Sequence, residues 1–222
     1  MLSVDLVVVP QGAEFQAVLH SFQRYGLDPV KIITIPMGSS NLLPTITNHA
    51  EKLITAKKIL LMGLCGSLNK SYVIGDTVAI SSCQNQLQQQ VELDSELTAE
   101  IEQLLSVESV ASLTSDHIIT QVREKAELGQ RYGTSIVEME GYYYVELLQQ
   151  QGISVAMVRI VSDDLSGNIP DLSGAVTPEG NLQALPLATA MLKQPRAAIR
   201  LIKGSLIGLK ALQQATVKLF SG

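Results

Sequence analysis

The sequence is poor in the residues that mark several classes of protein. It has no Trp and only 4% aromatic residues, so its core must be built from aliphatic side chains. Its two cysteines, Cys65 and Cys83, form no C-x-x-C pair, so the sequence indicates neither a disulfide framework nor a zinc site with cysteine ligands. The formal charge of −5 gives no electrostatic argument for binding nucleic acid. The remaining classes are globular proteins with small-molecule or protein partners.

Long apolar runs are absent as well. No stretch reaches the length needed to cross a bilayer, and Asp5 precedes a short apolar run that ends at Pro10, unlike a signal peptide. With two thiols suited to a reducing compartment, we expect a cytoplasmic protein. The 222 residues, 46% of them hydrophobic and 17% charged, predict a single globular domain over 1–222.

Acidic residues are missing from the C-terminal part. Residues 182–222 contain no Asp or Glu but six of the 16 basic residues, so the rest of the chain carries ten basic and 21 acidic groups, a net −11. A helical projection places most cations opposite a leucine-rich side, although Gly204 and Gly208 each weaken such a helix by about 1 kcal/mol. This basic tail is either a helix that packs on the domain with a solvated face, or a peripheral contact with anionic lipid.

Strand and helix patterns alternate along the rest of the chain. Apolar runs predict strands at 4–9, 31–35, 58–62, 76–82, 110–113 and 153–161, and amphipathic patterns predict helices at 14–25, 42–56, 93–105, 122–132 and before Gly152. Residues 84–90 (QNQLQQQ) and 165–180 predict loops. The pattern indicates an α/β protein, a three-layer α/β/α sandwich whose central sheet is mixed and largely parallel.

Groups that could perform chemistry stand at four expected strand ends. They are Glu14, the small-residue stretch 63–67 with Gly63, Cys65 and Gly66, the cluster Glu138–Glu140, and the end Ser162–Asp164. In open α/β sheets ligands bind beyond the carboxyl ends of the strands, so we expect these groups to meet at one edge. The stretch 63–67 reads as a loop whose backbone N–H groups approach a ligand.

Two motifs make the pattern specific. VEMEG at 137–141 and RIVSDD at 159–164 resemble the nucleoside phosphorylase and nucleosidase superfamily. MGLCGSL at 62–68 and VVVPQGAEFQAV at 7–18 are similar to its glycine-containing segment and first strand. The stretch 170–222 looks more loosely like one branch, the hopanoid-associated phosphorylases. The resemblance implies cleavage of the N-glycosidic bond of a purine nucleoside with a modified 5′ position, like methylthioadenosine, S-adenosylhomocysteine or adenosylhopane.

The resemblance also implies roles for individual residues. Asp163 would protonate the leaving purine at N7, and Ser162 would orient Asp163. Asp164 is the rival acid. Because adjacent strand residues face opposite ways, only one of the two aspartates can point into the site. Glu140 would bind the ribose hydroxyls and Glu14 would position the attacking water. Met139 would pack on the ribose, Glu138 would lie near it, and Gly63, Cys65 and Gly66 would contribute to substrate binding.

One departure from the resemblance bears on the nucleophile. The superfamily's phosphorylases carry a phosphate-binding arginine where this chain has Leu61, which favours water and hence hydrolysis over phosphate as co-substrate. A phosphate-dependent phosphorylase and an inactive nucleoside-binding protein on the same fold remain the alternatives. No cofactor and no metal site are expected, and His117 is interpreted as a rim residue.

The resemblance further implies a homo-oligomer. The loop 38–41 and the tyrosines Tyr142–Tyr144 are the segments that we expect at such a contact.

Overall fold

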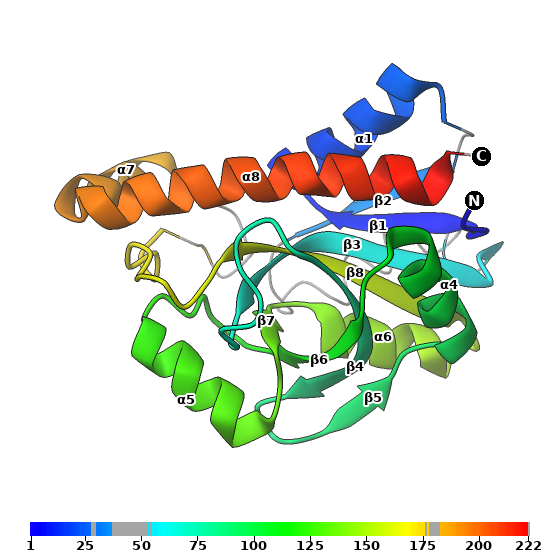
Figure 1. Ribbon diagram of the computed structural model, residues 1–222, viewed down its shortest axis with the longest axis horizontal. Helices are drawn as coiled ribbons and strands as arrows, with labels where there is room; N and C mark the ends of the chain where they lie inside the picture. Colours follow the sequence, from blue (N-terminus) through cyan, green and yellow to red (C-terminus); the bar gives the residue numbers. More distant parts are fainter. Residues whose placement is uncertain (28–29, 37–52, 54, 176, 178–182, 222) are drawn as a thin grey trace.

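The computed structural model describes residues 1–27, 30–36, 53, 55–175, 177 and 183–221. Its elements follow the alternation expected from the sequence (Figure 1). The strands are β1 (Leu6–Pro10), β2 (Lys31–Ile35), β3 (Lys58–Ser67), β4 (Thr77–Asn85), β5 (Gln90–Glu92), β6 (Ser109–Thr114), β7 (Ile136–Glu138) and β8 (Ser154–Asp163). The helices are α1 (Ala13–Tyr25), α4 (Ser95–Leu105), α5 (Val122–Tyr132), α6 (Gly141–Gln150), α7 (Ala184–Lys193) and α8 (Pro195–Phe220).

The sheet is mixed, with more parallel than antiparallel pairs. β1 pairs in parallel with β2 and β3, β3 with β8, and β6 with both β4 and β7. β3–β7, β4–β5 and β4–β8 are antiparallel. Together β3, β8, β4, β6 and β7 close a ring of pairings. Where β3 passes from Cys65 to Gly66, β8 carries one extra residue, Ser162, a bulge that bends β8 at this point. The mixed, largely parallel sheet is confirmed, and its partial closure is a feature that the sequence pattern did not predict.

Helices cover both faces of the sheet, which confirms the three layers (Figure 1). On one face α1, α4 and α8 bury aliphatic and aromatic residues, including Val18, Phe22, Ile101, Leu212 and Phe220. On the other face α6 buries its tyrosines and aliphatic residues among those of β3, β4 and β8. α5 lies at the end of β6 and β7, where Leu128 and Tyr132 pack on a small separate cluster.

One loop prediction was wrong, and a second holds only for residues 86–89. Residues 63–67 belong to β3, because the parallel ladder with β8 continues as far as Gly66. Residues 84–90 are a hairpin, since β4 runs to Asn85, whose Oδ1 accepts the N–H groups of Leu87 and Gln89 before β5 begins. The predicted helix at 42–56 and the loop at 38–41 lie outside the described residues, apart from a few at the helix's C-terminal end.

The basic tail forms two helices, because Pro195 begins α8 and separates it from α7. A Cβ placed on Gly204 would lie 2.0 Å from the Ser162 carbonyl oxygen. The glycines that weaken the helix by propensity therefore allow α8 to touch β8, a gain that the propensity argument leaves out.

Candidate active site at one edge of the sheet

Glu14 lies in the first turn of α1 and reaches across to β3. Its Oε1 accepts a hydrogen bond of 2.6 Å from the backbone N–H of Leu64. A Cβ on Gly63 would lie 2.9 Å from that oxygen and 3.0 Å from Nη1 of Arg159, so the bare glycine makes room for an acid and a guanidinium side by side. Burial raises the pKa of Glu14, against the Leu64 hydrogen bond and the Arg159 charge.

Glu138 ends β7 and uses its carboxylate within the protein. It accepts hydrogen bonds from Thr114 Oγ1 at 2.5 Å, from the N–H groups of Glu140 and Gly141 at 3.0 and 2.6 Å, and from Arg159 Nη2 at 3.0 Å. These bonds fix the turn from β7 into α6, where Glu140 stands. Glu138 is therefore placed to support its neighbours, while its expected proximity to the sugar remains a prediction.

Arg159 was noted in the sequence only as the one charge in an apolar strand. The register pairs it with Gly63, and its side chain is only 2% exposed in the ion pair with Glu138. Burial by itself would lower the pKa of Arg159, but the charges of Glu138, Glu140 and Glu14 raise it. Three carboxylates thus gather around one cation. A lone charge in an otherwise buried strand was the signal that could have found this residue.

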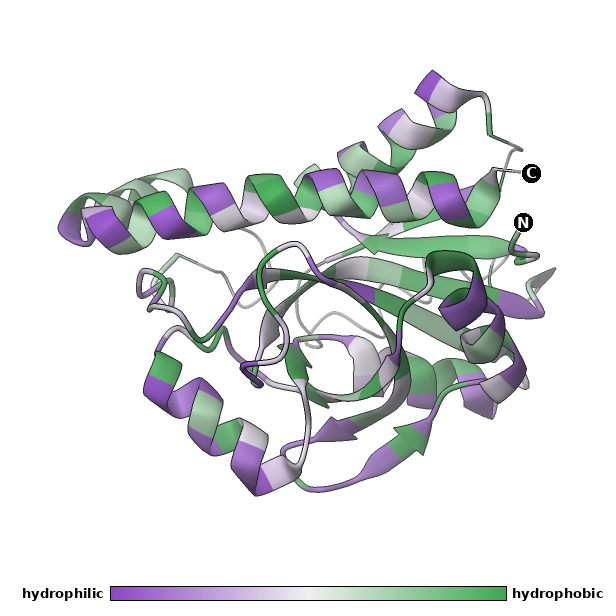
Figure 2. Ribbon diagram, in the orientation of Figure 1, coloured by the Kyte–Doolittle hydropathy of each residue, from purple (hydrophilic) through white to green (hydrophobic). Residues whose placement is uncertain are grey.

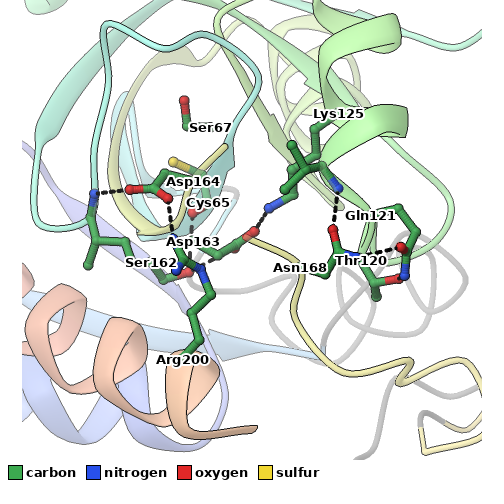
Figure 3. Close-up of polar contacts among 12 residues, drawn as sticks. Cys65, Ser67, Thr120, Gln121, Lys125, Ser162, Asp163, Asp164, Asn168 and Arg200 are labelled. Atoms are coloured by element: carbon green, nitrogen blue, oxygen red, sulfur yellow. Dashed lines mark hydrogen bonds and ion pairs between the residues drawn. The ribbon is translucent and has the colours of Figure 1, made fainter. Parts of the chain in front are cut away.

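Asp163 is the last residue of β8 and pairs with Gly66 of β3. A Cβ placed on Gly66 would lie only 3.1 Å from Asp163 Oδ1, so the glycine leaves room for the Asp163 carboxylate. Ser162 Oγ lies 3.4 Å from Asp163 Oδ2 and 3.2 Å from the Cys65 carbonyl oxygen, and its single proton can be donated to one of them at a time. Its role in orienting Asp163 stays a prediction. Lys125 of α5 forms an ion pair with Asp163 through Oδ1 (Figure 3). The expected acid therefore has a buried cationic partner.

Lys125 was not predicted as a site residue. Its side chain is 1% exposed, and burial lowers its pKa to about 8 against the opposing charges of Asp164 and Cys65. The helical pattern of 122–132 gave no reason to separate this lysine from a solvated face. Only the packing of α5 over the end of β8 buries it.

The loop after β8 holds α5 in this position. Asn168 accepts the Val122 N–H at 2.9 Å through Oδ1 and donates to Gln121 Oε1 at 2.8 Å (Figure 3). The Ile169 N–H adds a bond of 3.1 Å to the Thr120 carbonyl. The N-terminus of the Lys125 helix is therefore tied to the same strand end that carries Asp163.

Asp164 turns to different partners. It accepts from Arg200 Nη2 at 2.7 Å, from the Ile74 N–H at 3.3 Å and from both the N–H and the hydroxyl of Ser166. Burial would raise the pKa of Asp164, but these hydrogen bonds and the Arg200 charge hold it below its usual value. A carboxyl held ionised is a poor proton donor. Asp163 is likewise paired with a cation, Lys125, so the choice of Asp163 over Asp164 as the acid stays a prediction.

The other predicted residues lie in three settings. Gly63 and Gly66 leave space for the carboxylates of Glu14 and Asp163. The Cys65 thiol lies in the core, where burial raises its pKa to about 12. Met139 is half-buried between Glu138 and Glu140. His117 is exposed and pairs with Asp116 and Glu124, in agreement with a rim position. Among the described residues, no group of three His, Cys, Asp or Glu side chains could hold a metal ion.

The structure thus brings the predicted strand-end groups to one edge. Glu14, Glu138 and Glu140 surround Arg159 beside Gly63, and Asp163 stands beside Gly66, three residues further along β3. An acid with a raised pKa, a cation beside it and a separate carboxylate–ammonium pair are groups that can accept and donate protons.

A family model described as the phosphorylase superfamily matches residues 6–193, and the chain belongs to that superfamily. It is thus an enzyme of the phosphorylase superfamily. None of the curated protein sequences compared with the chain matches it.

Solved structures share the fold over nearly the whole chain. The 5′-methylthioadenosine/S-adenosylhomocysteine nucleosidase of Helicobacter pylori has a TM-score of 0.65 at 16% identity, covering 95% of this chain and 96% of its own. The futalosine hydrolase of the same organism gives 0.65 and 16%, with 96% of both chains covered. The methylthioadenosine/S-adenosylhomocysteine nucleosidase of Neisseria meningitidis gives 0.69 and 14%, covering 96% of this chain and 97% of its own.

Proposed function

We propose that this protein hydrolyses the N-glycosidic bond of a purine nucleoside that is modified at its 5′ position. The observation that carries the proposal is the pair of proton-transfer groups at one strand edge, Glu14 beside Arg159 and Asp163 beside Lys125. The structurally similar nucleosidases and the hydrolase support it, because their names describe the same class of reaction.

In the proposed reaction the bond between C1′ and the purine nitrogen breaks, and its electron pair leaves with the base. Asp163 gives a proton to purine N7, so that the base departs neutral, and the Lys125 ammonium returns a proton to Asp163. Water attacks the oxocarbenium-like C1′ while the Glu14 carboxylate takes its proton. The products are a free purine and a free sugar. Lys125 acts through Asp163 and is a positioning residue.

Water as the nucleophile is supported by the charge around Glu14. Arg159 is the cation beside three carboxylates, Glu14, Glu138 and Glu140, and its guanidinium already binds Glu138 at 3.0 Å. Among the described residues, a phosphate dianion would meet this net negative cluster with no cation left unpaired beside it, which is unfavourable, whereas neutral water meets no such penalty. Leu61, where the superfamily's phosphorylases have arginine, is buried in β3 and offers no charge.

A product assay tests the reaction and separates it from phosphorolysis. Purified protein is incubated with 5′-methylthioadenosine, S-adenosylhomocysteine, futalosine and adenosine, each with and without phosphate. We expect free base and free sugar at the same rate in both conditions, with preference for a 5′-modified nucleoside. Sugar 1-phosphate formed only with phosphate would establish the phosphorylase instead. Ligand binding without turnover of any nucleoside would establish the binding protein.

A matched pair of variants tests the acid. Asp163→Asn should abolish base release in a protein that is still folded at the assay temperature, although the loss of the partner of Lys125 lowers its melting temperature. Asp171→Asn makes the same chemical change at an exposed position and should leave turnover unchanged. Wild-type turnover by Asp163→Asn would remove Asp163 from the mechanism.

A further inference from the structure

The C-terminal hairpin of helices exposes an unusual number of large apolar side chains. α7 has no buried residue, although most of its ten residues are apolar. In Figure 1 this helix folds back beside the first half of α8 at one end of the molecule, away from the ring of strands. The apolar residues exposed on α7 and α8 are Leu185, Leu192, Ile199, Ile202, Leu206 and Ile207. We call these six residues the apolar face.

Cations border the apolar face and acids are missing from it. Lys193, Arg196, Lys203 and Lys210 are exposed on the same two helices, and the segment 182–222 contains no Asp or Glu. Figure 2 shows hydrophobic and hydrophilic residues alternating along the exposed side of α8. A helix pair that exposes large apolar residues together with cations and no acids has the composition of an element that lies in a membrane interface.

α8 can expose this face because its opposite side is already anchored. Gly204 and Gly208 bring the helix onto Ser162 of β8, and Leu212, Leu219 and Phe220 are buried against the sheet. Arg200 is drawn inward to Asp164 and is not part of the exposed border. The exposed apolar residues are therefore not an unfinished part of the core.

From this surface we propose that the α7–α8 hairpin docks the protein on an anionic lipid surface. The apolar face would enter the headgroup region, and the bordering cations would meet the lipid phosphates. Since the rest of the chain carries a net −11, an anionic membrane would repel other faces and select this one. Among the described residues no helix is long and apolar enough to span a bilayer, so the contact would be peripheral.

Charge also argues against a second copy of the chain as the occupant. A two-fold contact through the apolar face would bring Lys193, Arg196 and Lys203 against the same cations of the other copy. A lipid surface of opposite sign has no such repulsion. Contact of the face with the acidic remainder of another copy would build open-ended assemblies, which the experiment below detects.

The test is flotation of the full chain with vesicles of phosphatidylcholine alone and of phosphatidylcholine mixed with phosphatidylglycerol. We expect binding to the mixed vesicles that weakens as salt rises, and little binding to the neutral ones. The variant Lys193→Gln/Arg196→Gln/Lys203→Gln should bind on the order of 100-fold more weakly, since each basic residue contributes about a fivefold gain near such a surface. The control Lys31→Gln/Lys57→Gln/Lys70→Gln removes exposed charges elsewhere and should bind like the wild type.

A second pair of variants tests the apolar contribution. Leu185→Ser/Leu192→Ser/Ile202→Ser should reduce binding, whereas Leu87→Ser, at an equally exposed leucine far from the hairpin in sequence, should not. Each variant is checked for an unchanged melting temperature. Absence of binding to anionic vesicles would overturn the proposal, as would equal loss in the control. Sedimentation velocity in which only the hairpin variants lose self-association would assign the face to a second copy instead.

Discussion

Replacing Lys125 with methionine tests whether the buried lysine serves the leaving-group proton or only the fold. Methionine has a similar length and no charge, so the variant removes the ammonium from Asp163 with little change in volume. In the structure Lys125 is 1% exposed and is ion-paired with Asp163. General acid catalysis contributes about 10²- to 10⁴-fold to the rate, so we expect the variant to lower kcat/KM by a factor in that range.

The pH profile separates the two roles. The pKa of Lys125 is lowered to about 8 by burial, so its ammonium is lost as the pH rises through 8. Wild-type kcat/KM should therefore fall about tenfold per pH unit above that value, because the proton that Lys125 supplies is gone. Lys125→Arg keeps a cation that stays protonated far above pH 8, so we expect partial activity without this alkaline decline. Lys125→Met should show low activity that is independent of pH in the same range.

Stability provides the internal check. Removing one partner of a buried ion pair costs about 3–5 kcal/mol, because Asp163 is left without its partner. The double variant Lys125→Met/Asp163→Asn removes both charges and should recover most of that loss in a denaturant titration. A Lys125→Met protein that is folded, fully active and still declines above pH 8 would refute the role assigned to Lys125.

Three further outcomes follow from the packing. Gly204→Ala should destabilise the fold by about 1–3 kcal/mol or more in thermal melts, because the added Cβ would lie 2.0 Å from the Ser162 carbonyl oxygen; an unchanged melting temperature would contradict this packing. Cys65 and Cys83 should resist iodoacetamide at pH 8 in the native protein and react once unfolded, since burial raises the pKa of both thiols; mass spectrometry reads the labelling. Glu14 must be ionised to accept a proton, and its pKa is raised, so kcat/KM should be lost as the pH falls through a value above 4.5; Glu14→Gln should be inactive at every pH, and activity with the same acid limb would exclude Glu14 as the base.

Prediction from the sequence succeeded where a local pattern decides the structure. The apolar run after Gly152 became β8, and the acidic cluster became the turn from β7 into α6. It failed where pairing with a distant strand decides. Residues 63–67 were predicted as a loop because small residues are common in turns. In the structure they continue β3, because β8 extends alongside and pairs with them as far as Gly66. No local signal reports that a partner strand continues.

The candidate site divides in the same way. Glu14, Glu140 and Asp163 became candidates because they stand at strand ends, which meet at one edge, and their roles came from the resemblance of their motifs to the superfamily. Arg159 and Lys125 were missed because their importance depends on burial beside acids from other elements. In the sequence, a lysine that will be exposed on a helix cannot be distinguished from one that will be buried against a carboxylate. The position of the helix in the fold decides between them.

The sequence by itself determined the alternation of most strands and helices, the position of the carboxylates in the chain and the separation of charge between the domain and its tail. These follow from periodicity and composition, which are local. The tertiary structure decided which carboxylates share a cation, which cysteines are inert and which side of α8 stays exposed. Those properties depend on the desolvation and distance between residues far apart in the chain, and packing alone sets both.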